Sequence, residues 1–293
     1  MKLSLKEWPL VAFTILVQAV AGAFVLLFSL VVINAHHFFP SGAARLFPLF
    51  FRPAFGLLFL MGLSLIISLF HLGQPSAAYL AVRNVGTSWL SREILGSCLF
   101  FAGLILLSAF IYFDMSVSLI LIIASLEALL GLSLPYIMSK IYRLPAVPAW
   151  NNWRTTFSFY LSWLVIGAGY LPLAVRHFFS AGPGSTLAGQ TVSFLQIILL
   201  ISIVYLLLFD QVAGFFPLKN MISAENISGL KKFSKSRRWL LLLALLLSFC
   251  LSWSGVSLCL SGFLWPGLIL ALVVIEEVIG RTIFFGLYER LGV

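Results

Sequence analysis

Eight runs of about 20 apolar residues fill most of this sequence and limit what it can fold into. A helix needs about 20 apolar residues to cross the hydrocarbon core of a bilayer. The runs lack the alternating pattern of a barrel strand and are too long to be one. We therefore predict an all-α, polytopic integral membrane protein with eight transmembrane helices in a single domain, residues 1–293. The predicted spans are Leu10–Ile33, Phe47–Phe70, Ile94–Phe113, Met115–Met138, Thr155–Val175, Val192–Phe209, Trp239–Gly262 and Pro266–Leu287.

The composition agrees with a lipid environment. The chain is 61% hydrophobic and 9% charged, with a mean hydropathy of +1.10, whereas soluble domains carry about a quarter charged residues. The first run follows Lys2 and Lys6, as the core of a signal peptide would, but it stays apolar for too long to be a cleaved one. We expect it to remain as the first helix.

The net charge of +9 is interpreted as a topology signal, and no nucleic-acid partner is expected. With eight spans both termini share one side of the membrane, and most lysines and arginines fall on that side. The positive-inside rule would place that side in the cytoplasm. The basic cluster Lys231–Arg238 has two interpretations, attraction to lipid headgroups or docking of a partner protein.

Cysteine and histidine placement argues against metal cofactors in this chain. The three cysteines show no CxxC spacing, and an iron–sulfur cluster usually needs four thiolates. All four histidines lie at the ends of predicted spans, whereas a haem buried between helices would need paired histidines within them. We therefore expect no haem, no iron–sulfur cluster and no other metal site here.

Several ionisable residues lie inside predicted spans, where a charge costs about 3 kcal/mol at the bilayer centre. Glu277 and Arg281 are four residues apart on one helix and are expected to pair as a clamp. Glu127 has two interpretations, a protonated carboxyl bonded to a neighbouring helix or a proton relay. A faint Glu-x-x-x-Gly pattern repeats at Glu127 and Glu276, compatible with two four-helix halves.

The stretch between the second and third spans brings a histidine and a carboxylate to one membrane face. His71 ends the second span and Glu93 begins the third, with a helix-breaking Gly and Pro after the histidine. An imidazole titrates near neutral pH and accepts protons. This pair could serve quinol oxidation, which needs a base near a hydroxyl and an apolar slot. A plain interfacial histidine, and a glutamate favoured by the helix dipole, are the simpler alternatives.

The motif His71-Leu-Gly-x-Pro, followed by Val85-Gly-x-Ser-x-Leu-Ser-x-Glu-Ile, resembles the membrane anchor subunit of dimethyl sulfoxide reductase. The resemblance implies a multi-pass protein of the bacterial inner membrane that oxidises menaquinol, with His71 and Glu93 as the catalytic pair. It also implies two partners, a subunit with four [4Fe–4S] clusters and a molybdopterin catalytic subunit. Further candidate quinol-binding residues are Gln18, Arg83, Ser91, Arg92, Glu127, Glu277 and Arg281.

The chain departs from the family pattern at two places. Arg83-Asn84 stands where the family often has Asn-Arg, and Phe285 stands where it has Tyr. Family partners that carry a twin-arginine export signal would place the His71 face outside, against the positive-inside rule, so the orientation stays open. The terminal electron acceptor of the complex and the choice between menaquinol and ubiquinol also stay open.

Two other functions compete with quinol oxidation. One is a secondary transporter or proton channel that uses the carboxylates Glu127, Glu276 and Glu277. The other is a purely structural anchor whose partner does all redox chemistry.

Overall fold

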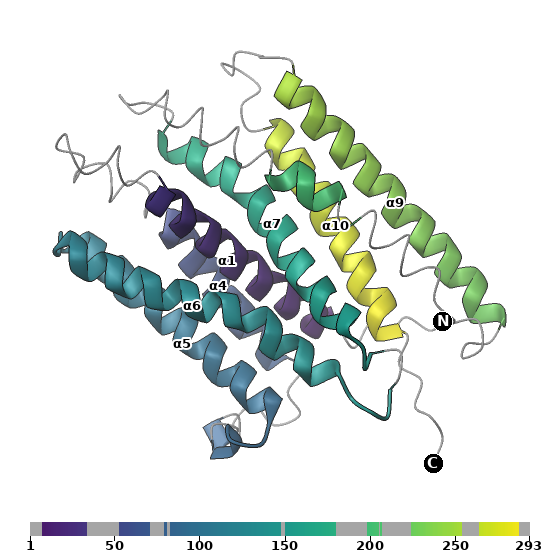
Figure 1. Ribbon diagram of the computed structural model, residues 1–293, viewed down its shortest axis with the longest axis horizontal. Helices are drawn as coiled ribbons and strands as arrows, with labels where there is room; N and C mark the ends of the chain where they lie inside the picture. Colours follow the sequence, from purple (N-terminus) through teal and green to yellow (C-terminus); the bar gives the residue numbers. More distant parts are fainter. Residues whose placement is uncertain are drawn as a thin grey trace.

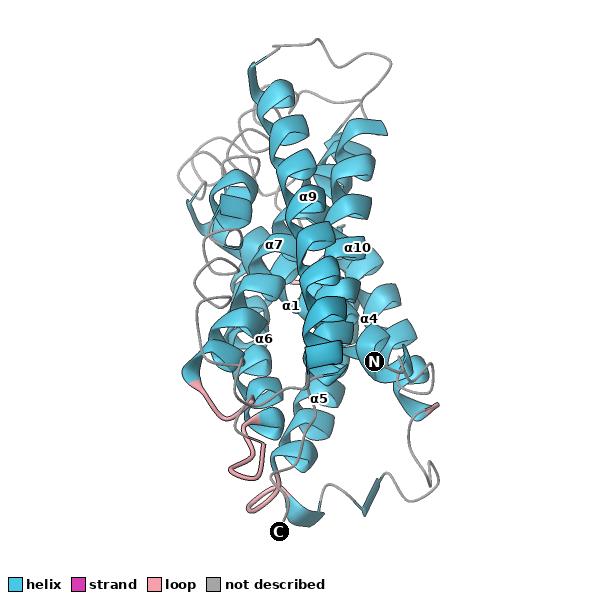
Figure 2. Cartoon of the chain, turned by 90° about the vertical axis from the view of Figure 1, so that its right-hand side faces the viewer, coloured by secondary structure: helices cyan, strands magenta, loops and turns pink. Residues whose placement is uncertain are grey.

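The computed structural model describes residues 8–33, 53–70, 79–80, 83–147, 150–179, 198–204, 206, 224–253 and 264–286. Within these ranges the chain is helical and has no strands, as predicted (Figures 1 and 2). The helices are α1 (Trp8–Ile33), α4 (Pro53–Leu69), α5 (Trp89–Tyr112), α6 (Val117–Tyr142), α7 (Trp153–Phe179), α9 (Ala224–Trp253) and α10 (Leu264–Gly286).

Helix α1 lies at the centre of the bundle. It packs against α4, α6, α7 and α10, while α5 lies outside α4 and α6 and α9 packs against α10 (Figure 1). Figure 2 shows the helices lying side by side along the long axis of the molecule. The central position explains why α1 is apolar on all faces, with Val17, Val20 and Phe24 fully buried.

Four described helices are long and apolar enough to cross a membrane: α1, α5, α6 and residues Trp153–Ala174 of α7. Helix α4, with 17 described residues, is shorter. Helix α10 carries three ionisable residues, Glu276, Glu277 and Arg281, near its middle and end. The run Val192–Phe209 lies largely outside the described residues. The structure therefore supports a multi-pass helical protein, and the number of eight spans stays a prediction.

Helix α9 begins at Ala224, 15 residues before the predicted span Trp239–Gly262, so residues 224–238, which lie between two predicted spans, are helical as well. Apolar periodicity marks only the part of a helix that is in lipid, and this segment is rich in lysine and arginine. It contains no proline, and lysine, arginine and glutamate are good helix formers. The basic cluster Lys231–Arg238 therefore belongs to a helix that continues into the predicted span.

Helix α5 also begins earlier than predicted, at Trp89 rather than Ile94. The cause is local, because Ser88 caps the helix: its Oγ accepts a hydrogen bond from the backbone N–H of Ser91 at 3.3 Å. Glu93 is thereby one turn inside the helix rather than at its first residue.

Two glycines bring α1 and α7 into backbone contact. A Cβ atom on Gly22 would overlap the backbone of Trp163, and one on Gly167 would overlap the backbone of Gly22 and Ala23. Such small residues let helix backbones approach closely in lipid. The α1–α7 crossing therefore depends on the absence of a side chain at both positions.

Candidate functional site

The predicted site lies at the end of the bundle where α4 ends and α5 begins. Helix α4 ends at Leu69, helix α5 starts at Trp89, and the two pack against each other. The connection between them starts and finishes at this end, as the sequence predicted. His71 lies outside the described residues.

Glu93 is a buried carboxyl group on α5. Its side chain is 3% exposed, and its Oε1 has no hydrogen-bond partner within the described part of the chain. Ser97 lies one turn further along the same face and is fully buried, and its Oγ also lacks a partner among the described residues. A buried polar atom left unpaired costs about 1–3 kcal/mol. Such groups in a native fold point to a catalytic role or to an unseen water or ligand.

The other candidates near Glu93 have structural roles or are exposed. Arg92 donates hydrogen bonds to the backbone oxygens of Val85 at 2.8 Å and Gly86 at 2.7 Å, and its guanidinium lies 4.2 Å from the centroid of the Trp89 ring. Arg92 therefore stabilises the turn that precedes α5. Arg83 is exposed.

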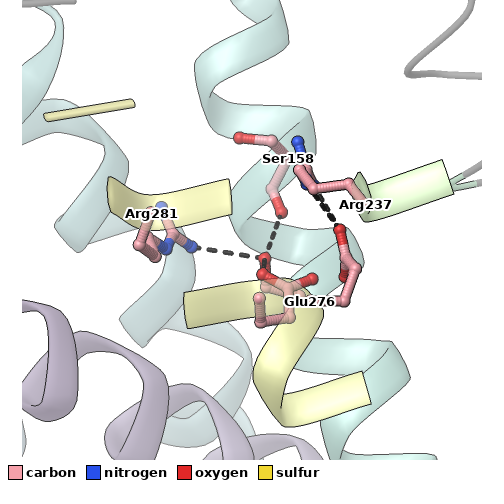
Figure 3. A network of polar contacts seen from close by, with 6 residues as sticks. Ser158, Arg237, Glu276 and Arg281 are labelled. Carbon is pink, nitrogen blue, oxygen red and sulfur yellow. Dashed lines mark hydrogen bonds and ion pairs between the residues drawn. The ribbon is translucent and has the colours of Figure 1, made fainter. Parts of the chain in front are cut away.

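A second cluster joins α1, α7 and α10; Figure 3 shows its members on α7 and α10. Arg281 donates from Nη2 to Gln18 Oε1 at 2.8 Å and to Ser162 Oγ at 3.3 Å. Ser162 donates from Oγ to Glu277 Oε2 at 2.7 Å. The guanidinium of Arg281 also lies 3.6 Å from the centroid of the Phe159 ring. Three predicted candidates, Gln18, Glu277 and Arg281, therefore meet in one buried network.

The predicted clamp of Glu277 and Arg281 includes a residue that the sequence did not indicate. Ser162 of α7 bridges the two, with its hydroxyl bonded to both. Serine is common in membrane helices, so nothing in the sequence distinguished Ser162 from other serines.

Glu276 pairs with a residue of α9. Arg237 donates from Nε to Glu276 Oε1 at 2.7 Å, and its guanidinium lies against Gly280, where a Cβ atom would overlap it. Figure 3 shows Arg237 reaching from α9 to the carboxylate on α10. With Arg281, the two arginines balance the charges of Glu276 and Glu277. The sequence assigned Arg237 to the basic cluster and missed this pairing, because no spacing rule links residues 39 apart.

Glu127 of α6 lies apart from both groups. Its side chain is 4% exposed and packs against Gly103 of α5, where it would overlap a Cβ atom. Its Oε1 has no hydrogen-bond partner among the described residues. The candidates are thus divided among three places: the start of α5, the α1–α7–α10 network and the α5–α6 interface.

Apolar helices joined by a buried, charge-balanced network define a polytopic membrane protein. The family model for the DMSO reductase anchor subunit (DmsC) matches residues 1–287. The chain belongs to this family, as the sequence motifs predicted, and it is a membrane anchor protein.

Curated relatives agree with this assignment. The chain is 36% identical over 177 residues to the C subunit of anaerobic dimethyl sulfoxide reductase from Haemophilus influenzae, 60% of each protein. It is 29% identical to the anaerobic dimethyl sulfoxide reductase subunit YnfH of Escherichia coli, over 98% of this chain and 96% of the relative. It is 33% identical to the C subunit of the Escherichia coli reductase over 58% of each protein. The alignments with the two C subunits thus span less than two thirds of those relatives. No solved structure matches the chain.

Proposed function

We propose that this chain is the quinol-oxidising anchor of a reductase complex in the bacterial inner membrane. In this proposal it takes electrons from menaquinol and passes them to a partner subunit with four [4Fe–4S] clusters. A molybdopterin subunit then reduces the terminal acceptor. The names of the relatives, subunits of anaerobic dimethyl sulfoxide reductase, support such a complex.

One observation carries the proposal: Glu93 is buried at the end of the bundle with a carboxyl oxygen that no described residue satisfies. A quinol hydroxyl is a suitable partner for this oxygen, because it donates the hydrogen bond that the carboxylate lacks. Oxidation of the quinol releases two electrons and two protons. Glu93 would hold the hydroxyl and receive a proton, and His71, beyond the end of α4, would act as the second base.

The surroundings suit a quinol. Leu90, three residues before Glu93 on α5, is an exposed apolar side chain that an isoprenoid tail can contact in lipid. The site is close to the helix ends, within reach of water and of a soluble partner. Arg92 holds the preceding turn through Val85 and Gly86, which fixes the start of α5 and the position of Glu93.

The first test is Glu93→Gln in the assembled complex. The amide keeps the size of the side chain but cannot accept a proton as a carboxylate does. We expect quinol-driven turnover to fall by about 100-fold, the usual contribution of a general base. Activity with an artificial electron donor to the soluble subunits should stay unchanged. His71→Arg should likewise lower quinol-driven turnover and leave the artificial-donor activity unchanged.

Thr87→Ala is the matched control, since Thr87 is exposed just before α5 and its hydroxyl bonds only locally, to Asn84 O at 3.4 Å. It should keep both activities. Full quinol-driven activity in Glu93→Gln would remove Glu93 from the mechanism and would favour a structural anchor.

The transporter alternative rests on three carboxylates, Glu127, Glu276 and Glu277, and only the last two have hydrogen-bond partners among the described residues. Glu276 is bonded to Arg237 and Glu277 to Ser162, which suits a clamp better than a moving proton or ion. Uptake of a substrate by the purified chain in liposomes would support a transporter.

A further inference from the structure

Two cations and two aromatic rings form a cluster where α5 begins and α6 ends. Trp89 of α5 and Tyr136 of α6 are in edge-to-face contact, with ring centroids 5.9 Å apart. The guanidinium of Arg92 lies 4.2 Å from the centroid of the Trp89 ring. The amino group of Lys140 lies 5.1 Å from the centroid of Tyr136 and 5.8 Å from that of Trp89. The cluster therefore holds two positive charges next to one pair of rings.

The positive charge of this cluster is not balanced by acidic side chains. Neither Arg92 nor Lys140 forms an ion pair with a carboxylate in the described part of the chain. Arg92 uses Nε and Nη2 to bind the backbone oxygens of Val85 and Gly86, which leaves Nη1 free to donate. Lys140 donates no hydrogen bond to a described residue, and both side chains are partly exposed. The cluster can therefore bind an anion from outside the chain.

The two charges are close enough together for one phosphate group. The guanidinium carbon of Arg92 and the amino nitrogen of Lys140 are at most about 10 Å apart, because they lie 4.2 and 5.8 Å from the same ring centroid. Charge-assisted hydrogen bonds to phosphate are about 2.8 Å long, and an ordered water can extend such a contact. A phosphate can thus contact both cations, directly or through one water.

The position of the cluster on the helices is that of the membrane surface. Trp89 is the first residue of α5, and Lys140 lies in the last turn of α6. Tryptophan and tyrosine are enriched where the hydrocarbon meets water, and long basic side chains at helix ends extend toward the headgroups. The phosphates of membrane lipids lie at this level.

An exposed apolar strip on α6 starts at the cluster and continues into the membrane. Its members are Tyr136, Leu132, Leu129 and Leu126, each at least 40% exposed. Their spacings of four, three and three residues keep them on one face of the helix, the face that also carries Lys140. From Leu126 to Tyr136 the strip is about 15 Å long, half of a hydrocarbon core about 30 Å thick. An acyl chain can lie along this strip while its headgroup contacts the cations.

We propose that Arg92, Lys140, Trp89 and Tyr136 form a binding site for an anionic phospholipid. Its phosphate accepts hydrogen bonds from the two cations, and one acyl chain packs on the strip of α6 from Leu126 to Tyr136. An acidic surface of a soluble partner would match the two charges but not the apolar strip, so the lipid fits the site better. The inference does not depend on the proposed quinol oxidation.

Lys140→Gln tests the site in the full-length chain, purified in detergent and measured by native mass spectrometry. Phosphatidylglycerol and phosphatidylcholine with the same acyl chains are the anionic and the zwitterionic probes. We expect the parent chain to bind phosphatidylglycerol at least about fivefold more tightly than phosphatidylcholine. Lys140→Gln should lower the affinity for phosphatidylglycerol about fivefold, the effect of one basic residue at a membrane surface. Lys140→Arg keeps the charge and should bind phosphatidylglycerol as the parent does.

Lys235→Gln is the matched control, because Lys235 is exposed on α9 and its replacement changes the net charge equally. It should leave the affinity of the most tightly bound phosphatidylglycerol unchanged. If Lys140→Gln does not fold, Lys140→Met replaces it with the same expected loss. Equal affinity of the parent for the two lipids, full affinity in the neutral variant at Lys140, or an equal loss in Lys235→Gln would overturn the site.

Two competitors distinguish the lipid from other anions. Glycerophosphoglycerol, the same headgroup without acyl chains, should not displace phosphatidylglycerol at equal concentration. Displacement would show that the cations bind a phosphate group alone, and the lipid site would be wrong. Retention of the lipid after addition of the soluble partner subunits would support the site, whereas its loss would assign the cations to a protein contact and would overturn the proposal.

Discussion

Gly167→Ala is expected to destabilise the bundle by about 3 kcal/mol or more, the upper part of the range for overpacked sites. The new Cβ would lie 2.6 Å from the backbone nitrogen of Ala23 and equally close to Gly22. A flexible side chain could move aside, but a helix backbone cannot move without its neighbours. Helix α1 would have to move away from α7, and it would then also lose part of its packing against α4, α6 and α10. The midpoint of denaturation by sodium dodecyl sulfate in detergent micelles measures this loss.

Gly267→Ala is the matched control for this substitution. Gly267 also lies in a helix, α10, but a Cβ atom there meets nothing within 4 Å. Alanine favours the helix over glycine by about 1 kcal/mol, so this variant should be at least as stable as the parent chain. Equal stability of Gly167→Ala and the parent would show that α1 and α7 do not meet at Gly22 and Gly167.

Arg281→Met is expected to cost about 3–5 kcal/mol, the usual effect of leaving a buried charge without its counter-charge; Arg281 and Glu277 are linked here through the hydroxyl of Ser162. The change removes the donor to Gln18 and Ser162 and the cation over Phe159. It also leaves the charge of Glu277 buried, and that uncompensated charge is the main cost. The same denaturation measurement applies, because methionine is close to arginine in length and keeps most of the apolar packing.

The double variant Arg281→Met with Glu277→Gln tests whether the uncompensated charge of Glu277 causes the loss of stability. If it does, neutralising this carboxylate should recover most of the lost stability, since a glutamine there can still accept the hydrogen bond from Ser162. Additive losses in the double variant would contradict the clamp. Lys235→Met removes a positive charge at an exposed position of α9 and should leave stability within about 0.5 kcal/mol.

The bounds of a helix were predictable from the sequence where contact with lipid requires a long apolar run. Apolar runs placed α1, α6 and α10 within a few residues, because burial of hydrocarbon is the main requirement in those segments. The errors came where a local contact sets the boundary. Ser88 starts α5 early through its cap, and the charged half of α9 is helical without being apolar. Neither effect has an apolar pattern that a search for runs can detect.

The candidate site was predictable as a set of residue types and less so as an arrangement. Buried carboxylates are costly, and this alone singled out Glu127, Glu276 and Glu277. Their partners depend on how helices pack, so Arg237 and Ser162 appeared only in three dimensions. Glu93 was chosen for its place at a membrane edge, yet its importance comes from its burial, which no linear pattern indicates.

The hydrogen bond from Arg281 to Gln18 joins residues 263 positions apart, and this has a consequence for biogenesis. Gln18 lies in α1 and its partner lies in α10, so α1 leaves the ribosome long before α10 does. Until α10 is made, the amide oxygen of Gln18 has no guanidinium to accept from, and the nascent chain carries an incomplete polar contact in the bilayer. Insertion of α10 therefore completes the polar network as well as the apolar packing of the bundle.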